Sequence, residues 1–151
     1  MKNAKLLFSL IFSLMAATVF GQRQSQPQRQ TEKVPVDLQQ ADSLIGGTFN
    51  GQRIDKLIGN VIFKQKDGLL YADSVYQYKE KNVLEAFGNV RINQADTVNI
   101  TGERATYNGD TRTAKIIGNV VMQDPRMTLT TPSLDYNLNT RTATYTEGGV
   151  I

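Results

Sequence analysis

Two acidic side chains, Asp73 and Glu103, are the residues whose type and spacing come closest to a catalytic pair. They occupy equivalent positions in two neighbouring sequence repeats, so stacked repeats would bring their carboxylates together, as two-carboxylate glycoside chemistry requires. The third copy of that position is Pro132, which has no acid. A position that recurs in every repeat is better explained as a solvated or turn-bonding group. We therefore expect these two acids to be structural.

The composition excludes most other reactive sites. The 151 residues contain no His and no Cys, so the commonest general base, thiol nucleophiles and thiolate zinc sites are absent. Asp67-Gly68 and Asp110 lack the spaced oxygen ligands of a calcium loop and are better interpreted as turn residues. We predict that the chain is not an enzyme and that it has no metal site and no cofactor.

The first residues have the pattern of a secretory signal peptide. Lys2 and Lys5 precede an apolar run over residues 6–20, and Val19 and Gly21 are the small residues before a cleavage site. The run is shorter than the ~20 apolar residues of a spanning helix, although an uncleaved anchor is the alternative. Cleavage after Gly21 removes two lysines and lowers the net charge from +3 to +1. The remaining basic residues are scattered, which argues against a nucleic-acid partner.

The segment that follows has the composition of a linker. Residues 22–40 are rich in Gln, contain Pro27 and Pro35, and lack periodic apolar residues. Such a segment cannot offset its ordering entropy by burial. The sequence thus predicts a signal peptide at 1–21, a disordered linker at 22–40 and a folded domain at 41–151.

The predicted domain is built from repeats of about 30 residues. A Gly-Asn-Val motif recurs, with a weaker Gly-Gly-Val copy at its end; the copies begin at Gly59, Gly88, Gly118 and Gly148. A second box lies between the glycine motifs, at Ala72–Gln77, Gly102–Tyr107 and Thr131–Tyr136, with a leading copy at Ala41–Leu44. Three linked copies at near-constant spacing are a strong signal of a repeat architecture.

Each repeat is predicted to contain two β-strands. After each glycine motif the apolar residues share one parity, as expected of a strand with one buried face: Val61, Phe63, Val90, Ile92, Val120 and Met122. In the second strand the parity switches midway, from Leu70, Ile100 and Leu129 to Val75, Ala105 and Leu134. The switch predicts a bulge or corner near Ala72, Gly102 and Thr131-Pro132.

The turns favour antiparallel pairing. Residues 107–111 contain Asn108-Gly109, a pair that supplies positive φ in tight hairpins, and residues 136–140 are its counterpart. A parallel β-helix with similar spacing is the alternative. Tyr107 and Tyr136 are interpreted as core or rim aromatics.

On these motifs the chain resembles the OstA-like proteins, the periplasmic lipopolysaccharide-transport group that includes the LptA-type bridge. The resemblance covers about residues 41–151 and rests on the Gly-Asn-Val copies, the boxes at Ala41 and Ala72, and residues 103–107 with their Asn-Gly turn. It implies an open, twisted β-jelly roll of antiparallel strands that is periplasmic and non-enzymatic. It also implies two partners: lipopolysaccharide, whose acyl chains lie between the faces of the roll, and other such jelly-roll domains, joined through edge strands.

The resemblance assigns the lipid A acyl chains to the inward apolar residues. The candidate lining residues are Val61, Phe63, Val75, Val90, Ile92, Ala105, Val120, Met122 and Leu134. The residues alone leave open whether these side chains line a groove or fill a closed core. Some basic residues are candidates for contacts with lipid A phosphates, with plain solvation as the alternative: Lys64, Arg91, Arg104 and Arg112.

The chain departs from the family pattern where it stops. It ends at Ile151, directly after the fourth glycine motif, so either it is part of a longer protein or its last strand edge is a docking surface. Three alternative functions stay open. They are the periplasmic domain of an outer-membrane lipopolysaccharide translocon, an exported structural β-repeat such as an adhesin or scaffold, and a carbohydrate-active β-helix enzyme.

Overall fold

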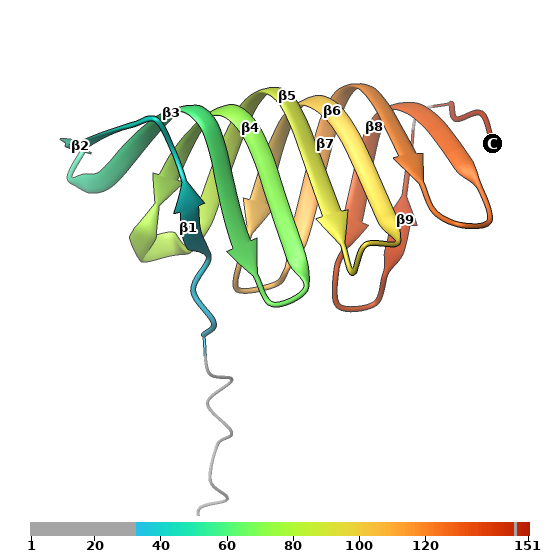
Figure 1. Ribbon diagram of the computed structural model, residues 1–151, viewed down its shortest axis with the longest axis horizontal. Helices are drawn as coiled ribbons and strands as arrows, with labels where there is room; N and C mark the ends of the chain where they lie inside the picture. The colour runs from blue at the N-terminus through green and yellow to red at the C-terminus, as the bar shows by residue number, and fades with distance from the viewer. Residues whose placement is uncertain (1–32, 147) are drawn as a thin grey trace, which may run out of the picture. The chain divides into compact units, whose positions relative to one another are not determined.

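The computed structural model describes residues 33–146 and 148–151, so the predicted signal peptide and most of the predicted linker lie outside the described residues. The described residues form one antiparallel sheet of nine strands, with a short 3-10 helix, η1 (Lys79–Lys81) (Figure 1). The strands are β1 (Asp37–Gln40), β2 (Ser43–Phe49), β3 (Gln52–Gln65), β4 (Gly68–Tyr78), β5 (Val83–Gln94), β6 (Val98–Asn108), β7 (Thr113–Gln123), β8 (Thr128–Asn137) and β9 (Thr142–Thr144). The predicted all-β fold of antiparallel strand pairs is confirmed, and the β-helix alternative is wrong. In this part of the chain there is no helix with the length and hydropathy to cross a bilayer.

Strand order in the sheet follows the chain. From β3 to β9 each strand pairs with the next one in sequence, while β1 and β2 lie end to end along β3. The two short strands therefore act as halves of one edge strand, interrupted at Ala41-Asp42, the leading copy of the second box. Short hairpin connections make this simple order possible.

The long strands bend midway at their glycine motifs. Gly59, Gly88 and Gly118 have φ values of 79°, 77° and 87°, and the Asn after each is also left-handed. The ladders shift register there and at the facing strand, for example between Phe87 and Val90 on β5 and between Tyr71 and Ser74 on β4. The predicted switch of parity near Ala72, Gly102 and Thr131-Pro132 is confirmed, because the buried positions on β4, β6 and β8 change parity there, opposite the extra residue on each glycine-motif strand.

These aligned bends fold the sheet over itself along one line, which we call the crest, at the upper margin of Figure 1. The strand halves that lead to the turns at 66–67, 95–97 and 124–127 form layer A. The halves that lead to the turns at 50–51, 79–82, 109–112 and 138–141 form layer B. We call the line opposite the crest, where turns of the two layers meet, the mouth.

The hairpin turns differ from the Asn-Gly prediction. Neither Asn108 nor Gly109 has positive φ; Arg112 does, with φ 53°. Oδ1 of Asn108 instead accepts hydrogen bonds from the backbone N–H groups of Asp110 and Thr111, at 2.9 and 3.1 Å. The Asn thus closes the turn through its side chain. Gly109 is required for close approach, since a Cβ there would lie 2.5 Å from Cγ2 of Val36.

The sheet begins earlier than the predicted domain boundary at Ala41. β1 starts at Asp37, and Val36 is already part of the core. The Val34 carbonyl accepts hydrogen bonds from the side-chain amides of Gln65 and Asn82, which are 31 and 48 residues away in sequence. Because these partners are so distant along the chain, the local composition of the segment gives no sign of them.

Candidate functional site

The nine predicted lining residues come together in the interior between the two layers. Each is at most 5% exposed: Val61, Phe63, Val75, Val90, Ile92, Ala105, Val120, Met122 and Leu134. Those that follow a glycine motif lie in layer A, and the other three lie in layer B. The mid-strand bulge makes this possible, because it lets both halves of one strand present apolar side chains to the same interior.

Cross-strand register arranges the interior side chains in continuous rows. One row of layer B runs across six strands through Leu57, Val75, Ala86, Ala105, Ile116 and Leu134. The matching row of layer A runs through Phe63, Leu70, Ile92, Ile100, Met122 and Leu129. Every member of both rows is buried. The result is an apolar interior that extends across the sheet from β3 to β8.

This interior is closed. The cavity at its mouth side, among Phe63, Leu70, Ile92, Tyr107 and Leu138, has a volume of about 10 Å³. That volume holds one water molecule at most. The nine side chains therefore pack against one another, and an acyl chain can lie among them only after the layers separate.

Two buried glutamines border the apolar interior at the mouth. Gln65 is 3% exposed and Gln94 is 1% exposed. The Tyr107 hydroxyl donates a 2.6 Å hydrogen bond to Oε1 of Gln65, and the Tyr136 hydroxyl donates a 2.8 Å bond to Oε1 of Gln94. We call each Gln–Tyr pair a clasp. The interpretation of both tyrosines as core aromatics agrees with their burial.

The remaining polar atoms of the clasps are also satisfied. Nε2 of Gln65 donates to the Gly109 carbonyl at 2.9 Å, and Nε2 of Gln94 donates to the Leu138 carbonyl at 2.7 Å. Burial raises the pKa of Tyr107 and of Tyr136, so both hydroxyls keep the proton that they donate. Fully paired amides in an apolar interior fix one arrangement of the two layers.

Arg112 belongs to this buried network, so the alternative that it is plainly solvated is wrong. Its side chain is 11% exposed and forms an ion pair with Asp67. Asp67 also accepts a 3.0 Å hydrogen bond from Nε2 of Gln94 and lies 3.7 Å from the Arg141 guanidinium. Burial raises the pKa of Asp67, but the hydrogen bonds from Arg112 and Gln94 outweigh it and hold the pKa below its usual value.

The other predicted basic residues lie outside the interior. The Arg91 guanidinium stacks 4.1 Å from the ring centroid of Tyr71, and the Arg104 guanidinium lies 5.2 Å from that of Phe87. Lys64 is exposed on β3. None of these three side chains lines the closed interior, although Arg91 borders a groove on the outer face of layer A.

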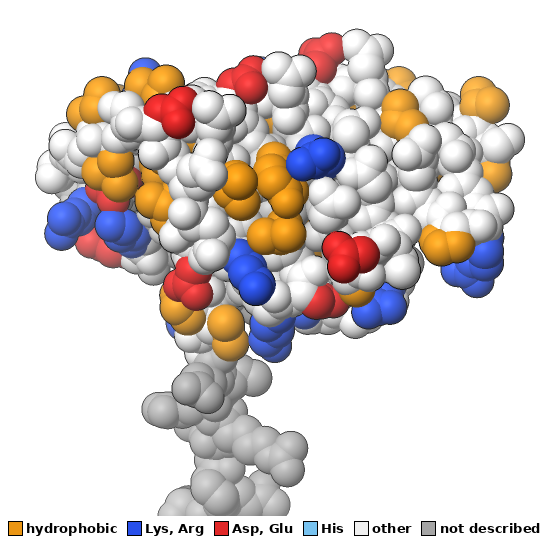
Figure 2. Space-filling model, in the orientation of Figure 1, with side chains coloured by type: hydrophobic (Ala, Val, Ile, Leu, Met, Phe, Trp, Pro, Cys, Tyr) orange, Lys and Arg blue, Asp and Glu red, His pale blue; other side chains and the backbone are white. Residues whose placement is uncertain are grey.

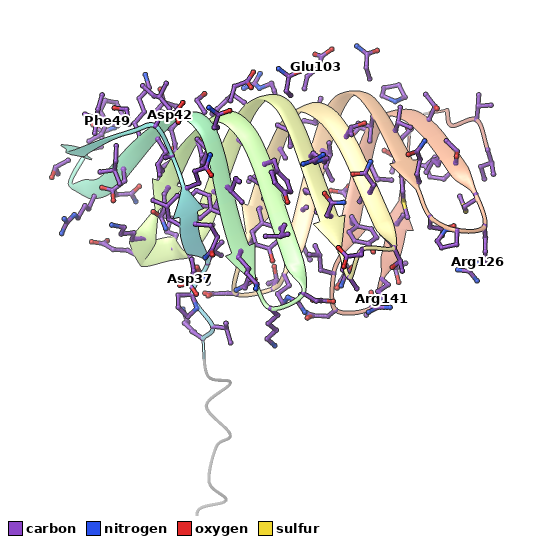
Figure 3. All side chains as sticks on the ribbon, in the orientation of Figure 1. Asp37, Asp42, Phe49, Glu103, Arg126 and Arg141 are labelled. Atoms are coloured by element: carbon purple, nitrogen blue, oxygen red, sulfur yellow. The ribbon has the colours of Figure 1, made fainter. Side chains whose placement is uncertain are left out.

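The acidic positions that first suggested catalysis are part of the crest. Asp73 accepts a 2.8 Å hydrogen bond from the Asn89 side chain, and Glu103 accepts a 2.5 Å bond from that of Asn119. Asp42 pairs with Asn60 in the same way, at 2.9 Å. Figure 3 places Asp42 and Glu103 at the upper margin, on the crest. Among the described residues, no group of three or more His, Cys, Asp or Glu side chains is arranged to hold a metal ion.

The clasp glutamines are not among the predicted site residues, although the sequence contains a signal for them. Gln65 and Gln94 are separated by the same 29 residues as Tyr107 and Tyr136. A polar residue that recurs at the repeat interval on an apolar face is unusual, because burying an amide costs free energy unless it is hydrogen-bonded. That recurrence could have marked both pairs as partners.

Fold and site together define a class: open antiparallel β-jelly rolls with a continuous apolar interior. Residues 33–151 match the family described as OstA-like protein, and the chain belongs to this family. Nineteen chains of solved structures match the fold. One is the crystal structure of LptH from Pseudomonas aeruginosa, described as the LptA homologous periplasmic component of the conserved lipopolysaccharide transport device. It superimposes with a TM-score of 0.65 at 17% identity, over 76% of this chain and 84% of that chain. No curated protein matches the sequence.

Proposed function

We propose that this chain is a non-enzymatic, periplasmic component of lipopolysaccharide export that carries the acyl chains of lipid A between its two layers. The observation that carries the proposal is the apolar interior that runs unbroken across six strands in a member of the OstA-like family. Burial of hydrocarbon is favourable by ~25 cal/mol per Å² and is non-directional. A uniform apolar lining therefore retains a lipid without fixing it at one point, as transport requires.

Because the interior is closed, the layers must part before the protein can carry lipid. Because the cavity at the mouth measures only about 10 Å³, acyl chains enter as the layers part and replace the contacts between them. The empty protein then keeps its apolar side chains out of water until lipid arrives. Export to the periplasm relies on the signal peptide at 1–21, with cleavage after Gly21, which lies outside the described residues.

The partners in this proposal include other jelly-roll domains that join at the sheet edges. The edge strand β2 exposes three large apolar side chains, with Leu44, Ile45 and Phe49 at 52%, 57% and 67% exposed. Val150 and Ile151, near the opposite edge, are 75% and 74% exposed. Figure 2 shows hydrophobic side chains at both ends of the sheet as well as near its middle. Exposed strand edges of this kind are templates for pairing with another sheet, and such pairing would continue the apolar interior into the next domain.

A photo-crosslinking amino acid at Phe63 or Ile92 tests the lipid role in cells. We expect ultraviolet light to produce a lipopolysaccharide adduct from these inward positions. The matched control is Lys115, the exposed neighbour of the buried Ile116 on β7, which should give no adduct. An exported, folded protein that gives no adduct from either inward position would refute the proposal.

One observation favours a second candidate, an exported structural β-repeat that acts as a scaffold. That function needs only a stable, dry core, and the interior of this chain is closed. The same crosslinking experiment separates the two candidates, because a scaffold gives no lipid adduct at Phe63 or Ile92.

A further inference from the structure

We propose that the two Gln–Tyr clasps are a latch at the mouth: formed, they hold the interior closed, and broken, they let acyl chains in between the layers. This inference rests on the proposed function, since it names the residues that control access to the lipid-carrying interior.

The clasp bonds run between the two layers. Gln65 is on β3 and its partner Tyr107 is on β6; Gln94 is on β5 and its partner Tyr136 is on β8. In each pair the partners are three strands apart in the sheet order and 42 residues apart in sequence. Bonds between such strands do not belong to the ladder. They cross the interior from layer A to layer B.

The clasps lie on the side of the molecule where the layers can separate. At the crest each strand continues from one layer into the other. The sheet can therefore bend at the crest while the layers stay joined there. At the mouth they are held by side chains: the two clasps, the amide bonds to the Gly109 and Leu138 carbonyls, and the ion pair between Asp67 and Arg112. The layers can therefore part at the mouth with the crest as a hinge, and the clasps are among the buried bonds that must break, together with the amide bonds of the same two glutamines.

The chemistry of the clasp groups suits a bond that opens. If apolar side chains closed the mouth, opening would expose them to water at a cost in free energy. An amide and a phenol can instead exchange their mutual hydrogen bond for bonds to water or to sugar hydroxyls. In the open state these groups would lie at the boundary between buried acyl chains and a polar headgroup. That boundary suits side chains with an apolar body and a polar tip.

The sequence offers a reporter for this opening. The chain has no Cys, so Ala114→Cys introduces a single thiol. Ala114 is 2% exposed and lies in register between Tyr107 and Tyr136. Its reaction with a maleimide in the absence of any lipid measures how often the mouth opens. Ala86→Cys, at a fully buried position of the next row, is a second reporter if the first variant does not fold.

The test replaces Tyr107 and Tyr136 by Phe, singly and together, in the mature chain with the reporter thiol. Each change removes one hydroxyl and keeps the ring. We expect the labelling rate to rise about fivefold for each lost hydrogen bond. Tyr78→Phe is the matched control, because that hydroxyl bonds Glu85 outside the interior, at 3.1 Å, and its loss should leave the rate unchanged.

Low urea concentrations distinguish a latch from a general loss of stability. Opening at the mouth exposes little surface, so labelling should depend weakly on urea, whereas global unfolding gives a steep dependence. The inference is overturned if the Phe variants fold and label no faster than Tyr78→Phe, or if their faster labelling has the urea dependence of global unfolding. Because no lipid is present, this result is independent of the crosslinking test of the proposed function.

Discussion

The side-chain amide of Asn89 donates a 2.8 Å hydrogen bond to the carboxylate of Asp73, and the ladder between β4 and β5 shifts register beside this pair. Gly88 precedes the Asn with φ 77°, and a Cβ on it would lie 2.5 Å from Oδ2 of Asp73. The glycine motif of one repeat and the acidic box of the previous repeat are thus two halves of one bend. The fourth copy, the Gly-Gly-Val motif at Gly148, supports this view. It has Gly149 where the other copies have Asn, and the box before it has Pro132 where the other boxes have an acidic residue.

The first prediction concerns the crest. Gly88→Ala should destabilise the fold by about 2–4 kcal/mol. The Ala backbone would be strained at the left-handed φ of this position, and its Cβ would clash with Asp73. In an Asp73→Ala background the contacts with Oδ2 and Cγ are gone and only the Cβ of that residue, at 3.1 Å, remains, so the cost of Gly88→Ala should fall to about 1–2 kcal/mol. Urea unfolding of the four proteins in this cycle measures the coupling. Gly47→Ala, where a Cβ meets nothing within 4 Å, is the control; additive costs at Gly88 and Asp73 would contradict the clash.

The second prediction uses the repeat as its own control. Gln94→Leu leaves the Tyr136 hydroxyl and the Leu138 carbonyl buried without partners, which should cost about 2–4 kcal/mol of unfolding free energy. Gln123 occupies the equivalent position one repeat later but is exposed. Gln123→Leu should change stability by less than about 0.5 kcal/mol. Equal effects of the two substitutions, measured by urea unfolding, would mean that the clasp has no special role in stability.

The third prediction is a pH dependence centred on Asp67. Hydrogen bonds from Arg112 and Gln94 hold its folded-state pKa below the usual value. Its contribution to stability is therefore fully present above the unfolded pKa of about 3.9, and it is lost as the pH falls through the folded pKa. We expect the urea midpoint to fall more steeply below pH 4 in the parent than in Asp67→Asn.

Asp96 provides the control for this titration, since it is exposed at the equivalent position of the next turn in layer A. Asp96→Asn should leave the acid part of the profile like that of the parent. If Asp67→Asn has the same profile as Asp96→Asn, the ion pair with Arg112 does not contribute to acid stability.

The fourth prediction concerns the edge strand β2. Leu44→Lys with Ile45→Lys places two charges on an edge that the proposed function assigns to pairing, so self-association should weaken. Sedimentation over a range of protein concentrations measures this change. Ile117→Lys adds a charge at a side chain that is 46% exposed but lies on β7, away from the edges, and should leave association unchanged. An identical effect of both substitutions would indicate association through the outer face of the sheet.

The regular features of this protein follow from local patterns in its sequence. Alternation after Gly59, Gly88 and Gly118, the parity switch near Ala72 and Gly102, and the antiparallel hairpins are all present in the structure. These features depend on residues within a few positions of one another, because side-chain direction in a strand and backbone freedom at glycine are local properties. Local rules therefore predicted the strands and the side of each strand that is buried.

Tertiary structure alone decided how the interior is closed. The Tyr136–Gln94 clasp, the buried Arg112 and the ordering of Val36 all depend on partners that are far away in the sequence. Whether Val90 and Ile92 line an open groove or a packed core depends on how closely the two layers approach, which no single strand determines. The physical reason is that the bends at the crest bring the two layers together. The distance between two facing side chains therefore depends on the bend of every strand between them, and not on the residues next to either one.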